Sequence, residues 1–209
     1  MFEIALVAFA TFFATIGPPD VAVIFSALTP LDTPRERFRL ALKATVVGAC
    51  ILLLFAFLGE PLLKHMGISM AAMRTAGGFL LLLIATDMVF ARISGGTSTT
   101  AEEKDEAAAS DDIAVFPMAT PLIAGPGAIG AAILLVAEAE GDPAHVAMVI
   151  GAMLAVLALT FVMMLAAGQI QRLLGKTGVH VITRVMGILL AALAVQFLFD
   201  GIKNSGVLG

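Results

Sequence analysis

The chain has 209 residues, of which 60% are hydrophobic and 13% are charged, and its formal net charge is −4. Soluble domains carry about 25% charged residues, so a chain with a mean hydropathy of +1.03 has too little polar surface to cover a globule in water. The composition therefore predicts an integral membrane protein and excludes a nucleic-acid-binding protein with a basic face.

Six apolar segments are long enough to cross a bilayer, which takes about 20 apolar residues in a helix. The predicted spans cover residues 2–28, 40–60, 70–91, 113–137, 144–168 and 179–201. Because Glu3 stands where a secretory signal would carry Lys or Arg, we expect the first span to be retained. The predicted fold class is an all-α membrane protein with six transmembrane helices.

Two of these spans contain residues that interrupt a helix near the middle of the span. The first span holds Gly17-Pro18-Pro19, and the fourth holds Gly125-Pro126-Gly127. Proline removes a backbone donor and clashes with the preceding turn. We therefore predict that helices one and four are broken at Gly-Pro.

An arginine follows each break at nearly the same distance along the chain. Arg74 lies 57 positions after Gly17, and Arg184 lies 59 positions after Gly125. Each arginine is followed three positions later by a glycine, namely Gly77 and Gly187. This shared spacing indicates two structural repeats, because paired broken helices in two halves of a membrane protein are typical of transporters.

Residues 93–112 are rich in Gly, Ser and Thr and then in acids, which predicts a flexible linker between repeat 1–92 and repeat 113–209. Lys and Arg favour one side of the membrane by nine to three, which predicts a bacterial-type inner-membrane protein with a cytoplasmic linker and two periplasmic termini. Because each repeat has three spans, the second repeat is expected to be inverted relative to the first. The nine are Arg35, Arg37, Arg39, Lys43, Arg92, Lys104, Arg172, Lys176 and Arg184, and the three are Lys64, Arg74 and Lys203.

Each break would place two kinds of helix end inside the membrane. One half-helix ends in free carbonyl groups, and the other begins with free N–H groups and a partial positive charge. These ends suit an ammonium and a carboxylate, so together they would bind a small zwitterion. We predict that Gly17, Pro18 and Pro19 form a substrate site with Gly125, Pro126 and Gly127, the alternative being two simple proline kinks.

Polar side chains within the spans supply further candidates. Asp20 follows the first break, where it would bind a proton, a sodium ion or a substrate ammonium, or would stabilise the first turn of the second half-helix. Asp87 in the third span is a second candidate for ion coupling. The uncharged polar residues expected to line the substrate cavity are Thr15, Thr120 and Gln196.

Arg74 and Arg184 begin the third and sixth spans. Each would either pair with an acid such as Asp20 or extend to the membrane interface. Together with Gly77 and Gly187, they are assigned a structural or gating role.

No HExxH, Walker or GxSxG pattern occurs, so we expect neither an enzyme nor a bound metal or other cofactor. Cys50, the single cysteine, cannot form an intramolecular disulfide. Coupling to protons or sodium is compatible with the acids in the spans. Assembly as a homo-oligomer within the membrane lipid is also compatible with the sequence.

Three groups of residues resemble the MarC family of inner-membrane proteins, also called the small neutral amino acid transporter family. The family usually has Asn-Pro at the first break, where this chain has Gly17-Pro18 and gains Asp20. The matching stretches are Gly67-Ile68-Ser69 with Arg74-Thr75-Ala76-Gly77-Gly78, then Pro117-Met118-Ala119-Thr120-Pro121 with Ala124-Gly125-Pro126-Gly127, and finally Leu174-Gly175-Lys176-Thr177-Gly178 with Arg184-Val185-Met186-Gly187 and Val195-Gln196-Phe197.

The resemblance covers nearly the whole chain and implies a six-span membrane protein. Some members of the family transport glycine, alanine and similar amino acids, whereas others are named for multiple antibiotic resistance. We therefore expect a secondary transporter of small neutral amino acids that works by alternating access. The alternatives are an exporter of drugs or other small metabolites and a membrane scaffold that transports nothing.

Overall fold

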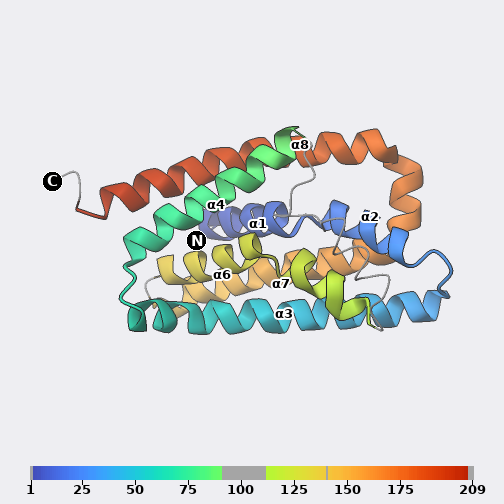
Figure 1. Ribbon diagram of the computed structural model, residues 1–209, viewed down its shortest axis with the longest axis horizontal. Helices are drawn as coiled ribbons and strands as arrows, with labels where there is room; N and C mark the ends of the chain where they lie inside the picture. The colour runs from blue at the N-terminus through green and yellow to red at the C-terminus, as the bar shows by residue number, and fades with distance from the viewer. Residues whose placement is uncertain (1, 91–111, 140, 207–209) are drawn as a thin grey trace.

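The computed structural model describes residues 2–90, 112–139 and 141–206, and within these ranges every regular element is a helix (Figure 1). In chain order the helices are α1 (Phe2–Ile16), α2 (Pro18–Leu28), α3 (Pro34–His65), α4 (Met70–Phe90), η1 (Ala114–Ile123), α6 (Pro126–Glu138), α7 (Pro143–Leu165) and α8 (Ala167–Lys203). Five segments are long and apolar enough to cross a membrane, and η1 with α6 makes a sixth as a bent pair. The predicted all-α membrane fold is confirmed. The predicted linker, apart from Asp112, lies outside the described residues.

Both predicted helix breaks are present. Gly17 adopts a left-handed conformation, with φ of 63° and ψ of 59°, between the end of α1 and the start of α2. In the fourth span, η1 and α6 meet at a bend of 54°. Pro18 and Pro126 open the helices that follow the breaks, as expected for a residue with a fixed φ and no N–H group.

The fourth span is irregular over a longer stretch than the sequence predicted. Phe116 and Thr120 have extended backbone angles inside η1, and the peptide bonds that precede Pro117 and Pro121 are cis. The two prolines remove backbone donors from this segment, so a regular α-helix cannot form before Gly125.

Two helix boundaries differ from the prediction. Helix α3 starts at Pro34 instead of residue 40, because Thr33 and Glu36 form a reciprocal capping box around a proline in the first turn. Helix α8 starts directly after α7, so the stretch around Arg172 and Lys176 that was predicted as a loop is helical. Hydropathy misplaced both starts because the first turn of α3 and the stretch of α8 around Arg172 and Lys176 are too polar to count as part of an apolar span.

The helices pack in a pattern that pairs elements from the two halves of the chain. Helix α4 lies along α8, which Figure 1 shows as neighbouring green and red ribbons. Helices α1 and α2 pack against α7, whereas η1 and α6 pack against α3. Among the five spans other than the bent pair, the first broken span is the most buried, with α3 and α7 packed around the two broken spans.

Glycines allow α4 and α8 to approach each other closely. A Cβ added at Gly78 would lie 2.8 Å from the carbonyl oxygen of Ala194 and 2.9 Å from the backbone nitrogen of Leu198. A Cβ added at Gly187 would lie 2.8 Å from the Cβ of Met88. Because the start of α4 meets the later part of α8 and the end of α4 meets an earlier part, the two helices are antiparallel.

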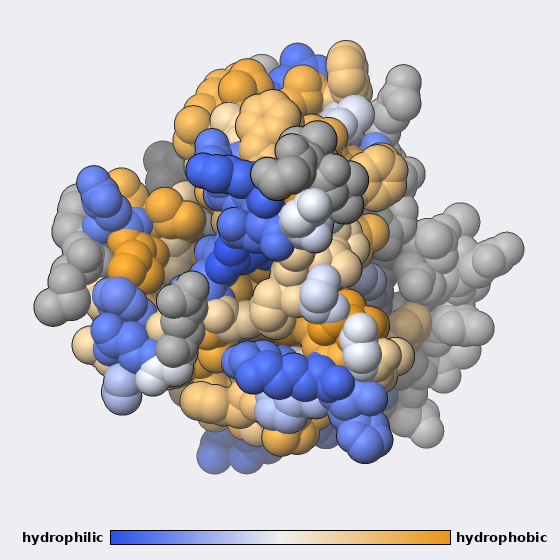
Figure 2. All heavy atoms as spheres, turned by 90° about the vertical axis from the view of Figure 1, so that its left-hand side faces the viewer, coloured by the Kyte–Doolittle hydropathy of each residue, from blue (hydrophilic) through white to orange (hydrophobic). Residues whose placement is uncertain are grey.

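The outer surface of the bundle is apolar, as expected for a surface that faces lipid. Leu54, Phe57 and Leu58 of α3 are each more than half exposed, at 54%, 56% and 56%. Figure 2 looks onto the end of the bundle where α4 begins, and hydrophilic residues gather there between apolar ones. Polar ends and apolar sides are the arrangement that a bilayer requires.

Candidate functional site at the two helix breaks

The structure brings the two breaks together in the interior. A Cβ added at Gly127 would lie 3.8 Å from the Cγ2 methyl group of Thr15, which precedes Gly17 by two positions. The same added atom would lie only 2.4 Å from Cδ1 of Ile84 on α4. Gly17, Pro18, Pro19, Gly125 and Gly127 are buried, whereas Pro126 is exposed, so the two breaks meet in the interior except at Pro126.

Backbone donors are distributed unequally between the two breaks. In α2 the first two positions are Pro18 and Pro19, which lack an N–H group, and the Val21 N–H already bonds to the Gly17 carbonyl at 3.0 Å. Asp20 is therefore the first residue of α2 that has a backbone N–H group at all. The expectation of several free N–H groups at the first break is therefore wrong, because two consecutive prolines remove them.

Helix α6 offers more donors at the second break. Its first position is Pro126, and the Ile129 N–H bonds to the Gly125 carbonyl at 2.9 Å. The N–H groups of Gly127 and Ala128 lie between these residues and have no acceptor one turn earlier in the helix. The positive end of α6 is therefore the better of the two for an anionic group.

Asp20 supplies the charge at the first break. A Cβ added at Gly17 would lie 3.4 Å from Oδ2 of Asp20, so the carboxylate folds back toward the break. The Thr183 hydroxyl of α8 donates to Oδ1 and Oδ2 of Asp20 at 3.5 Å and 3.4 Å. Asp20 is thus held between a break in the first half of the chain and a helix of the second half.

The candidate polar residues differ in how they are used. Thr15 is buried, and its hydroxyl donates to the Thr11 carbonyl of its own helix at 2.8 Å. The Thr120 hydroxyl donates to the Val115 carbonyl at 3.2 Å.

Gln196 does not join the buried region at the breaks. Its side chain is exposed, and its amide donates to both carboxylate oxygens of Asp200, one turn further along α8, at 3.1 Å. The predicted role in lining the cavity is corrected here, because helical periodicity turns Gln196 away from the buried positions Ala194 and Phe197.

The two arginines that begin the third and sixth spans behave differently. Arg74 pairs with Glu138 at the end of α6, with Nε and Oε1 3.2 Å apart, whereas Arg184 is exposed. The Arg74 Nε–H is not aligned for a hydrogen bond, so the contact is mainly an attraction between charges. Arg74 therefore pairs with an acid, as one of the two predicted options required, but the acid is not Asp20.

Asp87 is partly buried near the end of α4. It precedes Met88, which packs against Gly187, and Gly187 lies one turn after Thr183. The residue next to Asp87 therefore contacts α8 one turn away from Thr183, which bonds to Asp20.

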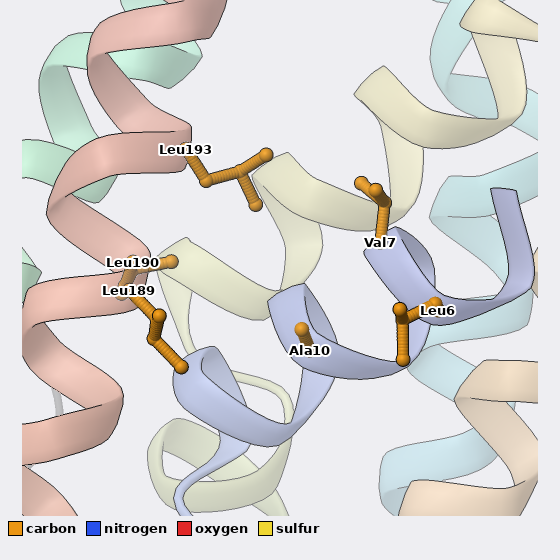
Figure 3. Close-up of a pocket in the computed structure, with 6 residues that line it drawn as sticks. All are labelled: Leu6, Val7, Ala10, Leu189, Leu190 and Leu193. Atoms are coloured by element: carbon orange, nitrogen blue, oxygen red, sulfur yellow. The ribbon is translucent and has the colours of Figure 1, made fainter. Parts of the chain in front are cut away.

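Two cavities lie outside the breaks. One, of about 340 Å³, lies between α1 and α8, and Figure 3 shows that only apolar side chains line it, namely Leu6, Val7, Ala10, Leu189, Leu190 and Leu193. The other, of about 220 Å³, lies between α1, α6 and α7 and is lined in part by Glu3, Glu138 and His145. A zwitterion would have no polar partner in the first cavity, so the first cavity does not suit an amino acid.

Sequence reasoning missed Thr183 and Glu138. Neither residue belongs to a local motif, and each gains its role from a partner in a distant helix. The sequence offered one signal, namely that Glu138 ends an apolar span and Arg74 begins another. This signal is weak, because the sequence does not reveal which spans are neighbours.

These features define a multi-pass integral membrane protein: its helices are apolar with polar ends, two of its spans are broken, and charged residues of the two halves contact each other. The chain belongs to the MarC family: the model for "MarC family integral membrane protein" matches residues 2–205. No solved structure matches the chain.

Several similar proteins are named only as UPF0056 membrane proteins. One from Methanocaldococcus jannaschii is 39% identical over 202 residues, which cover 96% of this chain and 96% of the relative. YvbG of Bacillus subtilis is 36% identical, with 98% of this chain and 96% of the relative covered. YhcE of Escherichia coli is 34% identical, with 94% and 90% covered.

Proposed function

We propose that this protein is a secondary transporter that carries small neutral amino acids across the inner membrane by alternating access. The observation that carries the proposal is the contact between the two breaks, in which Thr15 lies beside Gly127. Exposed backbone groups are costly in hydrocarbon and persist where protein, water or a ligand satisfies them.

The chemistry of the breaks favours a zwitterion. The N–H groups of Gly127 and Ala128 face the region at the positive end of α6, which suits a carboxylate. The carboxylate of Asp20 lies at the other break and suits an ammonium group. A glycine or alanine molecule carries both groups within a few ångströms, and the tight packing of Ile84 against Gly127 favours a small side chain.

The packing of α4 on α8 supports inverted repeats. Gly77 and Gly187 are 110 positions apart, as are Arg74 and Arg184. Gly187 contacts Met88. The same shift of 110 positions relates Met88 to Leu198, and Leu198 contacts Gly78, the neighbour of Gly77. An exchange of halves by a two-fold axis in the membrane plane would produce this reciprocal contact.

We further propose that Asp20 couples transport to protons or sodium, with Asp87 as a second candidate. An acid inside a membrane is costly unless it is used. The cycle as proposed needs no catalytic residue, metal or other cofactor, only the amino acid, the coupling ion and the surrounding lipid. Assembly of copies into a homo-oligomer is part of the same hypothesis.

Uptake into proteoliposomes tests the proposal. Labelled glycine and alanine should enter vesicles that contain the protein, and imposed proton or sodium gradients should change the rate. No uptake of any small neutral amino acid, with or without a gradient, would reject the transporter and favour the scaffold.

A second candidate function follows from the apolar cavity between α1 and α8. Leu6 and Leu189 on its rim are 56% and 55% exposed, so it opens toward lipid, as an exporter of apolar compounds would require. Efflux of an apolar dye that is lost when Ala10 is replaced by Phe, with alanine uptake absent, would favour this candidate.

A further inference from the structure

Arg37 occupies an unusual position where α3 begins. Its Cζ lies 5.7 Å from the centroid of the Phe25 ring on α2, and Phe25 is fully buried. The next residue, Phe38, packs edge-on against Phe161 of α7, with ring centroids 5.5 Å apart. The first turns of α3 therefore close a corner formed with α2 and α7.

The guanidinium group of Arg37 has one unsatisfied edge. Nε and Nη2 are both buried and have no hydrogen-bond acceptor among the residues that the structure describes. The contact with Phe25 stabilises the face of the cation but accepts nothing from its N–H groups. Leaving buried donors of a charged group unpaired is unfavourable, so such a group calls for an explanation.

The nearby acids are already engaged. Glu36 accepts hydrogen bonds from the backbone N–H and the hydroxyl of Thr33, at 2.8 Å and 2.7 Å. Asp112 pairs with Lys43, and the hydrogen bond from that ammonium lowers the pKa of Asp112 below its usual value. Neither acid accepts a hydrogen bond from Nε or Nη2 of Arg37.

Nε and Nη2 form the side of the guanidinium that binds two oxygens at once. Two parallel N–H groups match the spacing of a carboxylate, a geometry that lysine cannot reproduce. We propose that this edge of Arg37 binds the carboxylate of the amino acid at the end of the transport path where α2 meets α3. The proposal rests on the transport function proposed above.

The ligand is expected to reach Arg37 when α2 moves. Phe25 covers the guanidinium and lies eight positions after Gly17, which joins α2 to α1 through a left-handed turn. Movement of α2 at this break would uncover the edge, and the structure shows it covered. The edge is enclosed between helices and not turned to lipid, which favours a soluble carboxylate over a lipid phosphate.

The test compares Arg37→Gln and Arg37→Lys with Arg39→Gln, which removes the same charge from an exposed position two residues away. Alanine binding is measured by titration of the purified full-length protein, and alanine uptake in vesicles of zwitterionic lipid. Alaninamide, acetate and inorganic phosphate serve as probes, because they separate the carboxylate from the amine and from other oxyanions.

We expect Arg37→Gln to weaken alanine binding by at least about tenfold, Arg37→Lys to weaken it by less, and Arg39→Gln to leave it within about twofold. Without ligand, the melting temperature of Arg37→Gln should equal or exceed that of the wild type, because a partly buried charge with unpaired donors is replaced by a neutral amide. Alaninamide should bind the wild type more weakly than alanine does and should bind Arg37→Gln no worse than the wild type.

The outcomes separate this proposal from the transport function. Equal alanine affinity and uptake in the wild type and Arg37→Gln would overturn the carboxylate site and leave the transporter standing. Alanine binding that depends on Arg37 without uptake would support the site and reject transport. Binding of phosphate alone, or of no ligand at all, would overturn the proposed site.

Discussion

The Cγ2 methyl group of Thr15 lies 3.8 Å from the point that a Cβ would occupy at Gly127. This contact joins the first half of the chain to the second at the two places where the helices are broken. The Thr15 hydroxyl bonds to the Thr11 carbonyl within α1, and Thr15 presents its methyl group to Gly127.

Replacing Gly127 should therefore disturb the breaks directly. The Cβ of Gly127→Ala would lie 2.4 Å from Cδ1 of Ile84, the far end of a side chain that can shift, and Gly127→Leu would fill the region. We expect Gly127→Ala to reduce alanine uptake and Gly127→Leu to abolish it, with membrane insertion unchanged. Uptake and the amount of protein in the membrane are the two measurements.

Gly130→Leu is the matched control, because no described heavy atom lies within 4 Å of a Cβ added there. It changes the same helix one turn later and should keep wild-type uptake. A second variant, Gly127→Ala with Ile84→Val, shortens the clashing side chain and should recover part of the loss. Wild-type uptake in Gly127→Leu would contradict a site at the breaks.

Asp20 and Thr183 should be coupled in function. Asp20→Asn keeps the shape of the side chain and removes its charge, so it should abolish the dependence of uptake on the proton or sodium gradient. Thr183→Val removes only the long hydrogen bonds of 3.4 Å and 3.5 Å, so it should reduce the affinity for the ion by a few-fold. The double variant should resemble Asp20→Asn, and additive effects would indicate that the two residues act separately.

The spans and the two breaks could be predicted from the sequence because both depend on local features. Apolar length identifies a span, and Gly-Pro inside it identifies a break. The starts of α3 and α8 were misplaced because the polar first turn of α3 and the polar stretch of α8 around Arg172 lie outside any apolar window. The irregular backbone of η1 follows from Pro117 and Pro121, but which residues become extended depends on packing.

The partners of the charged residues were beyond sequence reasoning. Arg74 could pair with several acids, and only the packing of α4 against α6 selects Glu138. The same holds for Asp20, whose contact with Thr183 depends on α8 lying against α2. Gln196 failed as a cavity residue because a polar type in a span does not reveal which way its helix is turned.

The pair of Arg74 and Glu138 should stabilise the end of the bundle that contains it. The side chains are 19% and 27% exposed, so the loss of one partner should cost about 1–2 kcal/mol, between the values for exposed and buried pairs. We expect Arg74→Gln and Glu138→Gln each to lower the melting temperature in detergent. The double variant should lose less stability than the sum of the losses in the two single variants. A fully additive loss of stability would mean that the ion pair contributes nothing.

We predict the orientation of the chain in the membrane from the distribution of its positive charges. A reporter fused after Gly209 should be active in the periplasm, and one inserted within residues 97–110 should be active in the cytoplasm, because Lys and Arg accumulate on the cytoplasmic side. Paired fusions of alkaline phosphatase and green fluorescent protein at both sites provide the measurement. Two reporters on the same side would be incompatible with an odd number of spans in the second half.

The glycines between α4 and α8 should matter for stability in a reciprocal way. A Cβ at Gly78 would meet the backbone of Ala194 and Leu198 at 2.8 Å and 2.9 Å, and one at Gly187 would meet Met88 at 2.8 Å. Backbone atoms cannot move aside as the end of a side chain can, so the two helices would have to separate. We expect Gly78→Ala and Gly187→Ala each to destabilise the protein by about 1–3 kcal/mol, the range for overpacked cores.

Gly151→Ala on α7 provides the comparison, because none of the described atoms comes within 4 Å of its added Cβ. Alanine favours a helix over glycine by about 1 kcal/mol, so this variant should keep or raise the melting temperature in detergent. The decisive measurement is the melting temperature of all three variants under one condition. If Gly78→Ala lowers it and Gly187→Ala does not, the two contacts are not equivalent, and the two-fold relation between the halves loses its support.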